Sequence, residues 1–578
     1  MAAPAGRAAT DHARDHARDQ ARDHSVEPAP EVARLRSGFL TVALATLGLV
    51  TFVLLAVGLW MDDGHFVYVF DDTAVHMSMA RQLADHATWG VTAHHYSSAS
   101  SSPGWTLLLA AFTFLFPFAR DALPLLLNLA AAVSVIVLFD RHQTLLRFSR
   151  RSPLPIAVTV ACVAVLWFLP GLVLVGMEHV LHAALFLVIL VFVNRLVHGA
   201  TSTRTTCWFL VVMGAATAVR FETAFVAVAA AIAFVASSHP TFGRETRHLL
   251  TTRRALWLSA GAVAACAAPL GVYAAINRAF GEGYLPNSIL AKIGHGRLFG
   301  LFRSPQAALE SIASDPALLT LMLIAFAYLA WAAIDGPQRN AAIAIVFLVT
   351  ALLHGFFADI GWFERYQAYL VIGGSFVAFR IAAEVFDATR RRRVLVVTLA
   401  LISVLALGKA VHLAEVPLGE SNTYRQRYQV AKFLHRYYDG RAFLTGELGY
   451  TTLLHDGPVV DVLGLGTYPI ASAIHDGAKQ LDATFVEKLA EERHVQVMAV
   501  YVAAPGFSVP KHWQVVAQWR LNEPKITIPD DTIAFYAPKG APTRELEKHL
   551  HAFRSELPSR VTVITREELF RQYIQKSS

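Results

Sequence analysis

Residues 38–60 read GFLTVALATLGLVTFVLLAVGLW, and residues 65–90 read HFVYVFDDTAVHMSMARQLADHATWG. The first run is apolar over about 20 residues, the length of a helix that spans a bilayer, so we expect an uncleaved membrane anchor. The second run places two adjacent carboxylates, Asp71 and Asp72, just beyond that span. A carboxylate at the edge of the hydrocarbon is costly unless water or a cation meets it, so the pair indicates a functional site. For Asp72, which opens a helical pattern, a helix N-cap is the structural alternative.

The whole sequence has the composition of a polytopic membrane protein. Of its 578 residues, 55% are hydrophobic and 16% are charged, and the mean hydropathy is +0.44. The net charge of +7 comes largely from arginine clusters between apolar runs. This is the positive-inside pattern of membrane proteins, so we expect no nucleic-acid partner. The clusters are Arg147, Arg150 and Arg151; Arg244, Arg247, Arg253 and Arg254; and Arg390–Arg393.

The apolar runs predict a polytopic α-helical membrane domain with about 11 spans. Arg34 and Arg36 precede the first span, so we expect the N-terminus inside the cell and Asp71 and Asp72 outside it. The short run Trp105–Phe118 is expected to lie on the membrane, because a crossing there would place the next arginine cluster outside. The predicted spans are 38–60, 123–139, 156–170, 180–197, 208–219, 224–236, 256–276, 317–334, 341–357, 368–383 and 394–411.

The stretch from Trp208 to Ala236 is apolar except for a charged centre at Arg220 and Glu222. One continuous helix would bury both charges at mid-bilayer, whereas arginines on both flanks indicate that both ends are cytoplasmic. We therefore expect a hairpin whose arms of about 12 to 15 residues rise some 20 Å, less than the roughly 30 Å hydrocarbon core. Its tip would lie in a polar cavity, where Arg220 suits an anionic ligand. A structural ion pair between Arg220 and Glu222 is the alternative.

After the last span the composition becomes that of a soluble α/β domain. Residues 420–578 combine helical runs such as YRQRYQVAKFLHRYY with strand-like runs separated by Gly and Pro. The strand-like runs are AFLTGELGY, PVVDVLGLG, VQVMAVYV and TIAFYAP. The chain thus divides into a disordered cytoplasmic tail at 1–37, a membrane domain at 38–415 with its first external loop at 61–121, and an extracytoplasmic α/β domain at 420–578.

Polar residues outside the basic loops gather in the segments that are expected on the outer side. Carboxylates there can act as a general base, and cations there can receive a phosphate. The candidate site residues are Asp71, Asp72, His76 and Arg81 in the first external loop; Glu178 in GMEHVLH; Arg220 and Glu222 at the hairpin tip; Asn287 and Lys292 in GYLPNSILAK; and Arg365 in GWFERYQ.

These elements, in this order, resemble the GT-C membrane glycosyltransferases, which take sugars from polyprenyl-phosphate donors. FDDTAVHMSMARQLADHATWG and SSPGWTLLLA resemble the first external loop of that family, and GMEHVLHAALF resembles its Gly-Met-Glu element. VRFETAF is similar to an Arg-Pro-Glu-Gly element, with Phe221 and Thr223 in place of Pro and Gly. GYLPNSILAK is similar to a Leu-Pro-Asn element that ends in Lys, and ELGYTTLLHDGPVVDVLGLG to the C-terminal domain. The resemblance is nearest to the actinobacterial terminal arabinofuranosyltransferase branch.

The resemblance implies a GT-C fold and an enzyme that transfers a sugar from a polyprenyl phosphate. The acceptor would be a hydroxyl of a cell-envelope glycan, lipid or protein outside a bacterial plasma membrane. Asp71 would be the general base, with Asp72 as the alternative. Because the leaving group is a lipid monophosphate, no obligatory metal or other cofactor is expected, although the aspartate pair could bind Mg²⁺ or Ca²⁺.

The other candidate residues then take supporting roles. The departing phosphate would be stabilised by the cations Arg220, Lys292 and Arg365. Glu178 and Glu222 would orient these cations, and Arg81 and Asn287 would support the site. His76 would assist the phosphate, and an ordinary surface histidine is its structural alternative.

Two other classes of protein share this composition. A transporter or flippase for lipid-linked sugars also has many spans, but transporters often contain internal repeats, and the two halves of this sequence show none. The large outer α/β domain and the acidic pair in the first external loop favour an enzyme. A non-catalytic protein that organises cell-envelope assembly is the third alternative.

Overall fold

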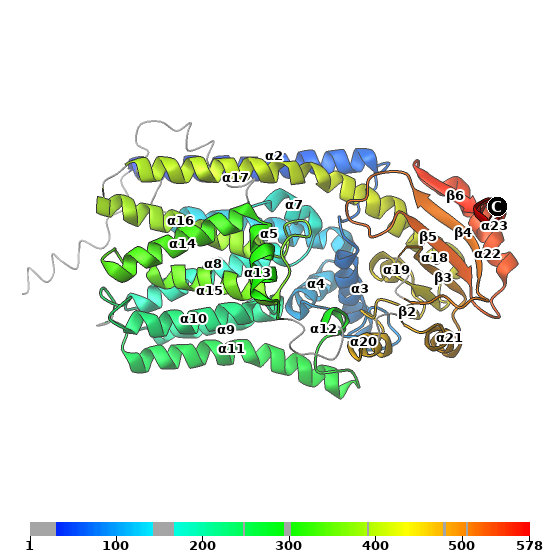
Figure 1. The fold of residues 1–578 in the computed structure, drawn as a ribbon, viewed down its shortest axis with the longest axis horizontal. Helices are drawn as coiled ribbons and strands as arrows, with labels where there is room; N and C mark the ends of the chain where they lie inside the picture. Colours follow the sequence, from blue (N-terminus) through cyan, green and yellow to red (C-terminus); the bar gives the residue numbers. More distant parts are fainter. Residues whose placement is uncertain are drawn as a thin grey trace, which may run out of the picture.

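The computed structural model describes residues 30–142, 167–246, 249–293, 302–389, 392–477, 481–503 and 507–577. Within these ranges the chain forms an elongated body whose two parts lie end to end (Figure 1). Long helices run side by side through one part, which we call the bundle. The other part is an α/β domain with a mixed sheet, and it contains the C-terminal helix. This is the predicted combination of a helical membrane domain and a C-terminal α/β domain.

The helices of the bundle follow the predicted apolar runs. Six helical segments are long and apolar enough to cross a membrane: Leu40–Met61, Pro117–His142, His179–Val197, Thr252–Ala279, Pro316–Ile334 and Ala368–Thr389. The structure thus supports a multi-pass membrane protein, whereas the count of 11 spans and their orientation stay predictions. The predicted span 156–170 lies mostly outside the described residues.

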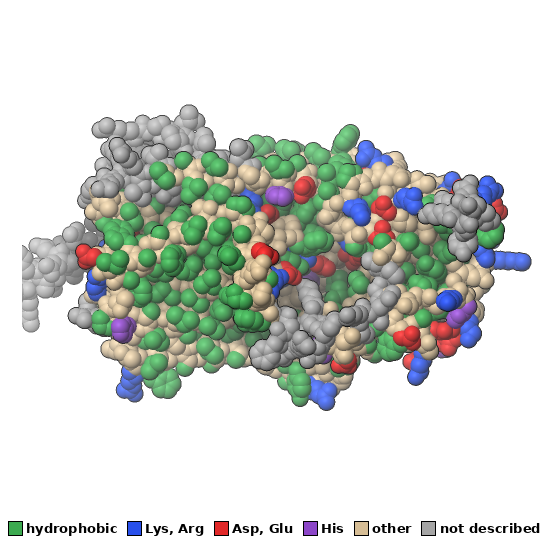
Figure 2. Space-filling view, in the orientation of Figure 1, with side chains coloured by type: hydrophobic (Ala, Val, Ile, Leu, Met, Phe, Trp, Pro, Cys, Tyr) green, Lys and Arg blue, Asp and Glu red, His purple; other side chains and the backbone are tan. Residues whose placement is uncertain are grey.

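The bundle has α16 (Ala368–Thr389) near its centre and α2 (Pro30–Met61) and α11 (Thr252–Ala279) at its periphery. Each of these helices contains a long apolar stretch. The buried share of that stretch is 83% in α16, but only 28% in α2 and 22% in α11. On the face shown in Figure 2, hydrophobic side chains are frequent over the bundle, whereas charged side chains are more frequent over the α/β domain. In chain order the bundle contains α2 (Pro30–Met61), α5 (Leu123–His142), α7 (Leu169–Val175), α8 (His179–Val197), α9 (Thr203–Val219), α10 (Thr223–Ser238), α11 (Thr252–Ala279), α13 (Pro305–Ala313), α14 (Pro316–Ile334), α15 (Ala341–Phe357), α16 (Ala368–Thr389) and α17 (Arg392–Asn422).

Shorter helices occupy the junction between the bundle and the α/β domain (Figure 1). They are α3 (Asp71–His86), α4 (Pro103–Leu115), the 3-10 turn η1 (Pro117–Ala122) and α12 (Asn287–Ile293). Together α4 and η1 take up the predicted interfacial run, and they expose large apolar side chains such as Phe114 and Phe118. That exposure fits a helix that lies on a membrane, and the placement itself stays a prediction.

The α/β domain is built on one six-stranded sheet with the strand order β2-β1-β3-β5-β4-β6. β1 pairs in parallel with β2 and β3, and the other pairs, β3 with β5, β5 with β4 and β4 with β6, are antiparallel. The strands are β1 (Phe443–Thr445), β2 (Val459–Asp461), β3 (Val497–Tyr501), β4 (Gln514–Leu521), β5 (Thr532–Ala537) and β6 (Val561–Thr565). The helices are the π-helical η4 (Thr423–Tyr428), α18 (Gln429–Tyr438), α19 (Gly449–Leu454), α20 (Tyr468–His475), α21 (Ala483–Glu492), α22 (Thr543–Phe553), the 3-10 turn η5 (Arg554–Glu556) and α23 (Arg566–Ser577).

Each of the four predicted strand-like runs contains a strand, namely β1, β2, β3 and β5. The predicted helical run YRQRYQVAKFLHRYY is confirmed as η4 and α18, which continue directly from α17. β4 and β6 are additional. The register of β4 shifts between Val515 and Ala517, and this irregularity breaks the alternation of apolar residues that marks a strand in a sequence.

The junction is fastened by contacts between α3 and α19. The Asp71 carboxylate accepts the backbone N–H groups of Gly449 at 2.6 Å and Tyr450 at 2.9 Å. Farther along α3, Ser78 Oγ donates to the carbonyl of Thr452 at 3.1 Å. Because helix N-termini carry unpaired N–H groups, a carboxylate from another segment can satisfy them and bring partial charges of opposite sign together. Asp71 therefore docks the α/β domain on the bundle side of the molecule.

Replacing Gly449 with alanine should undock α19 from α3. The added carbon would collide with the Asp71 carbonyl oxygen and lie 2.7 Å from the Asp71 Cγ. We expect faster amide hydrogen exchange over residues 443–455 and a lower unfolding temperature in detergent. Gly446→Ala is the matched control, because its added carbon would meet no atom closer than 3.8 Å. Equal exchange in the two variants would contradict the docking role.

Candidate functional site

Asp71 and Asp72 are neighbours on α3 but have different partners. Asp71 is 6% exposed, and both of its carboxylate oxygens accept N–H groups of α19. The Asp72 side chain is 44% exposed, and its Oδ2 lies 2.8 Å from Nη1 of Arg365. Successive residues on a helix point about 100° apart, so the two carboxylates reach different sides. Because α3 begins at Asp71 and has no side-chain cap, the N-cap alternative for Asp72 is wrong.

Arg365 is a buried cation that faces the exposed carboxylate of Asp72. Its side chain is 5% exposed, and it also contacts Met177 Sδ at 2.8 Å and the Tyr366 hydroxyl at 3.0 Å. The guanidinium carbon lies 4.5 Å from the centre of the Phe70 ring, within the range of a cation–π contact. Among the described residues, Asp72 is its one carboxylate partner. Arg365 can therefore exchange this partner for another anion, such as a phosphate.

The backbone that leads to Arg365 follows an unusual left-handed course. Gly361, Trp362, Phe363 and Glu364 have φ angles of 96°, 46°, 64° and 61°. Each non-glycine residue in this conformation costs about 1 to 2 kcal/mol, so the surroundings must impose it.

Ion pairs from two other segments hold this turn in place. Lys409 of α17 places its Nζ 2.9 Å from Asp315 Oδ2 and also pairs with Glu364. Gln367 Nε2 donates to Asp315 at 3.0 Å and to Glu364 at 2.8 Å. These side chains fix the backbone directly before Arg365, and we regard them as its positioning residues. One residue in the sequence indicated this cluster, namely Lys409, which lies inside the predicted span 394–411. It was not predicted as a site residue because the mean hydropathy of the span is high.

Arg220 lies at the tip of the predicted hairpin, which is confirmed as α9 and α10. Its Nη1 lies 2.7 Å from Glu178 Oε1, its Nε lies 3.0 Å from Glu222 Oε2, and its Nη2 also pairs with Glu222. The Arg220 side chain is 9% exposed, and that of Glu178 is fully buried. The ion-pair alternative for Arg220 and Glu222 is thus present in the structure. With two carboxylates around it, Arg220 is less able than Arg365 to take a further anion.

A tight turn in the GMEH sequence aims Glu178 at Arg220. Gly176 ends α7 with a φ of 73°, a conformation that favours glycine. A Cβ at this position would also lie 2.5 Å from the ring of Tyr68. Glu178 follows two residues later, immediately before α8 begins at His179. The local sequence therefore determines where this carboxylate stands.

His76 and two further histidines are buried beside these charges. His76 Nε2 lies 3.8 Å from Glu178 Oε2, and its Nδ1 faces Thr106 Oγ1 at 2.9 Å. Because His76 is only 3% exposed, the surface alternative is wrong. His179 and His182 are also buried, and both belong to the GMEHVLH element, in which the sequence prediction selected only Glu178.

The Leu-Pro-Asn element packs against the serine-rich segment that precedes α4. The backbone N–H of Asn287 donates to the carbonyl of Ser98 at 3.2 Å, and the same nitrogen lies 3.1 Å from the Ser98 Oγ. The backbone N–H of Ser98 in turn donates to Glu282 Oε2 at 2.9 Å. Burial raises the pKa of Glu282, while its hydrogen bonds with Ser98 act in the opposite direction. Asn287 therefore supports a loop of the first external segment. The side chain of Lys292 lies outside the described residues, so its role stays a prediction.

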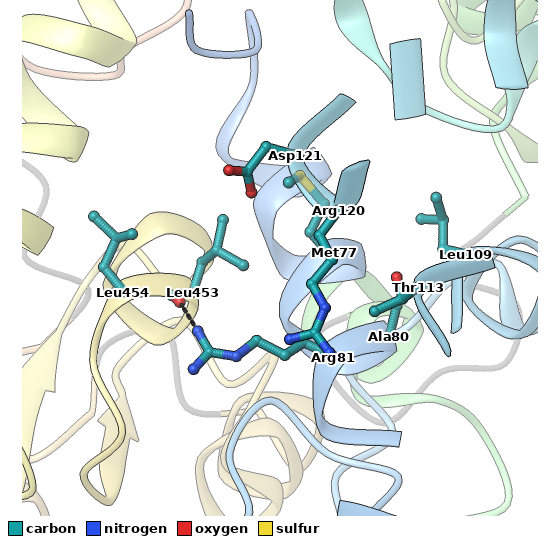
Figure 3. Close-up of a pocket in the computed structure, with 9 residues that line it drawn as sticks. All are labelled: Met77, Ala80, Arg81, Leu109, Thr113, Arg120, Asp121, Leu453 and Leu454. Carbon is teal, nitrogen blue, oxygen red and sulfur yellow. Dashed lines mark hydrogen bonds between the residues drawn. The ribbon is translucent and has the colours of Figure 1, made fainter. Parts of the chain in front are cut away.

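Arg81 lies about 180° around α3 from Asp72 and lines a separate cavity of about 230 Å³. Residues of α3, α4, η1 and α19 surround this cavity (Figure 3). Figure 3 shows the Arg81 guanidinium reaching across it to the carbonyl of Leu453, at 2.9 Å. Arg120, also in the cavity wall, pairs with Asp85 through two hydrogen bonds of 2.9 and 2.6 Å. Arg81 thus helps to join α3 to α19, on a face that Asp72 does not share.

Two further carboxylates, the mostly buried Glu447 and the buried Asp461, lie in the α/β domain near the carboxyl ends of β1 and β2. Burial raises the pKa of Glu447 to about 7, although Arg427, 2.9 Å away, acts in the opposite direction. Burial also raises the pKa of Asp461 to about 6. The Asp461 carboxylate accepts the backbone N–H groups of Leu463 and Gly466, both at 2.9 Å, and these hydrogen bonds act to lower its pKa. Asp461 therefore fixes the turn after β2.

Within the described ranges, no three His, Cys, Asp or Glu side chains are grouped so that they could hold a metal ion. The Asp71 carboxylate accepts N–H groups of α19, and the Asp72 carboxylate pairs with Arg365. Binding of Mg²⁺ or Ca²⁺ by this pair stays a prediction. That the reaction needs no obligatory metal or other cofactor stays a prediction.

One protein family and several solved structures match this chain. Residues 417–536 match a family described as "Domain of unknown function (DUF8728)". No curated protein matches the sequence. The chain is similar to ArnT from Cupriavidus metallidurans bound to undecaprenyl phosphate, with 12% identity, a TM-score of 0.46, and 85% of this chain and 98% of that chain covered. It is also similar to the archaeal oligosaccharyltransferase AglB from Archaeoglobus fulgidus in complex with an inhibitory peptide and a dolichol-phosphate, with 11% identity, a TM-score of 0.47, and coverage of 91% and 75%.

Removing Arg220 should destabilise the folded protein. Arg220→Met leaves Glu178 buried without its cation, and an uncompensated buried charge costs about 3 to 5 kcal/mol. Adding Glu178→Gln removes that charge, so the double variant should unfold closer to the wild-type temperature than Arg220→Met alone. Thermal unfolding in detergent measures both, with Arg204→Met, an exposed position at the start of α9, as the control. If Arg220→Met unfolds at the same temperature as this control, the cluster does not hold the hairpin.

Proposed function

We propose that this protein is a membrane glycosyltransferase of the GT-C type that transfers a sugar from a polyprenyl phosphate to a hydroxyl group. The observation that carries the proposal is the ion pair between Arg365 and Asp72. It combines a buried guanidinium with a half-exposed carboxylate where an apolar bundle meets an α/β domain. Transfer from a lipid phosphate at this junction requires a cation that stabilises the phosphate and, beside that cation, a base that accepts the proton of the attacking hydroxyl. The ordered series of motifs that resembles GT-C enzymes supports the same reaction.

Arg365 is the proposed ligand of the donor phosphate. Its guanidinium can bind two phosphate oxygens at once, and its burial strengthens the attraction because little water screens it. The incoming phosphate takes the place of Asp72 as the partner of Arg365. Lys292, predicted from the Leu-Pro-Asn element, is the proposed second cation. The cluster of Arg220, Glu178 and Glu222 forms the wall behind this site, and the buried His76 lies between that wall and α4.

Asp72 is the proposed general base. Once the phosphate has engaged Arg365, the Asp72 carboxylate accepts a hydrogen bond from the acceptor hydroxyl. As the acceptor oxygen forms its bond to C1 of the sugar, the bond between C1 and the phosphate oxygen breaks. The hydroxyl proton passes to Asp72, and the polyprenyl monophosphate leaves with its negative charge against Arg365.

The hydrogen bonds of Asp71 favour this assignment over the one first predicted from the sequence. Both Asp71 oxygens are used by the N–H groups of Gly449 and Tyr450, so an attacking hydroxyl would have to displace a buried structural contact. We propose that Asp71 holds the α/β domain against α3 and thereby keeps Asp72 in place. The alternative weighed from the sequence, in which Asp72 is the base, thus becomes the preferred one.

The finer parts of the proposal rest on the sequence. The positive-inside pattern supports an active site on the outer face of a bacterial plasma membrane, and the acceptor would then be a glycan, lipid or protein of the cell envelope. The motif series is nearest to the arabinofuranosyltransferase branch, so an arabinofuranosyl phospholipid is the first donor to test.

Asp72→Asn should lower sugar transfer by about 10² to 10⁴-fold, because the amide keeps the size of the side chain but cannot take a proton. Asp71→Asn is the matched neighbour and should lower transfer far less than Asp72→Asn, because its amide oxygen can still accept one of the two N–H groups of α19. The measurement is transfer of labelled sugar from a panel of polyprenyl-phosphate sugars to envelope acceptors, in membranes that contain equal amounts of folded protein. The reverse ranking would make Asp71 the base. Absence of transfer by the wild type from every donor in the panel would refute the proposed reaction.

A further inference from the structure

A second polar cavity lies in the bundle, far from the candidate site. It has a volume of about 270 Å³ and lies where the last turns of α5 and α8 meet the middle of α16. These helices are drawn in the bundle in Figure 1. Its lining residues are His142, Val191, Asn194, Arg195, Phe376 and Arg380. α8 and α16 begin beside the candidate site, at His179 and Ala368; Arg195 lies in the last turn of α8, and Arg380 lies 12 residues after the start of α16.

The described lining of this cavity contains two arginines, Arg195 and Arg380. Among the described residues no carboxylate lines it, and neither Arg195 nor Arg380 forms an ion pair with one. Arg380 Nε donates to Asn340 Oδ1 at 2.8 Å, and its Nη1 donates to the His142 carbonyl at 3.1 Å. These neutral contacts orient the guanidinium, and the nearest carboxylate, that of Glu384, acts on its charge without forming an ion pair with it. Arg195 is exposed at the edge of the same cavity.

The nearby carboxylate of Glu384 is engaged elsewhere. It stands one turn after Arg380 on α16 and accepts the Tyr328 hydroxyl at 2.8 Å and the Asn340 amide at 2.7 Å. Its oxygens therefore serve a hydrogen-bond network with α14 and the start of α15. The two cavity arginines remain available to an external anion.

The cavity combines this positive charge with an apolar wall. Val191 and Phe376 line it, each four residues before an arginine of the same helix, Arg195 on α8 and Arg380 on α16. A soluble anion would use the arginines alone, whereas a phospholipid would also place its glycerol and first methylenes against the apolar wall. Basic pockets between membrane helices on the cytoplasmic side are a general form of anionic-lipid site.

We propose that this cavity binds the phosphate head group of an anionic phospholipid, taken from the leaflet opposite the α/β domain. The phosphate lies between Arg195 and Arg380, and the acyl chains leave the cavity along the outer faces of the helices. The site is independent of the proposed transfer reaction, because none of its residues belongs to the candidate active site.

The test measures which lipids the detergent-solubilised, delipidated protein retains, by native mass spectrometry with phosphatidylglycerol or phosphatidylcholine added. The wild type should retain phosphatidylglycerol at least fivefold more than phosphatidylcholine. Arg195→Gln should reduce the retention of phosphatidylglycerol at least threefold without changing the unfolding temperature, because the exposed side chain makes no structural ion pair. Arg204→Gln, another exposed arginine at the same end, is the matched control and should retain wild-type levels. Arg380→Gln should have a larger effect, with thermal unfolding recorded to exclude misfolded protein.

Three outcomes would overturn the proposal. Equal retention of phosphatidylglycerol by Arg195→Gln and Arg204→Gln would show that the cavity is not the site. Equal retention of the two lipids by the wild type would show that no anionic head group is selected. In a separate arm, sodium phosphate alone is titrated into the delipidated protein. Displacement of phosphatidylglycerol by millimolar phosphate would assign the arginines to a soluble anion and not to a lipid.

Discussion

Charged side chains that are buried between the bundle and the α/β domain must be paired, because an unpaired charge in a protein interior costs several kcal/mol. Arg220 meets this requirement with two carboxylates from two segments, Glu178 and Glu222. Arg365 meets it with Asp72, whose side chain is 44% exposed. The difference separates the two arginines by role. A cation enclosed by two carboxylates fastens helices together, whereas a cation with one half-exposed partner can exchange that partner for a ligand.

The helix α3 connects the site to the rest of the molecule. Asp71 holds α19 of the α/β domain, and its neighbour Asp72 faces Arg365, because adjacent helical residues point in different directions. The other connection is α17, which carries Lys409 to the left-handed turn before Arg365 and continues directly into η4 and α18. The α/β domain is thus joined to both partners of the central ion pair. Its docking therefore bears on the geometry of the site even though the site itself lies on the bundle side.

Features that depend on residues close together in the sequence could be predicted, whereas those that depend on residues far apart in the sequence could not. Apolar runs located the helices of the bundle, and two charges in the middle of one run were enough to predict the hairpin at Arg220, because burial of charge is a local constraint. The position of Glu178 also depends on a nearby residue, because the turn at Gly176 precedes it by two residues. By contrast, the partner of Asp71 lies 378 residues away in the chain, and no local pattern indicates it. His76 looked like a surface residue because α3 carries polar side chains on several faces, yet ten of its residues are buried between the bundle and the α/β domain. The strand β4 escaped prediction because its register shift disrupts the alternation of its side chains.

The central claim is that the donor phosphate replaces Asp72 as the partner of Arg365. It is tested most directly by the affinity of an unreactive polyprenyl monophosphate for the wild type and for Asp72→Asn, at one pH and ionic strength. The account predicts tighter binding to Asp72→Asn, because a neutral amide competes less for the guanidinium and does not repel the phosphate. Equal or weaker binding to Asp72→Asn would contradict the account and place the phosphate away from Arg365.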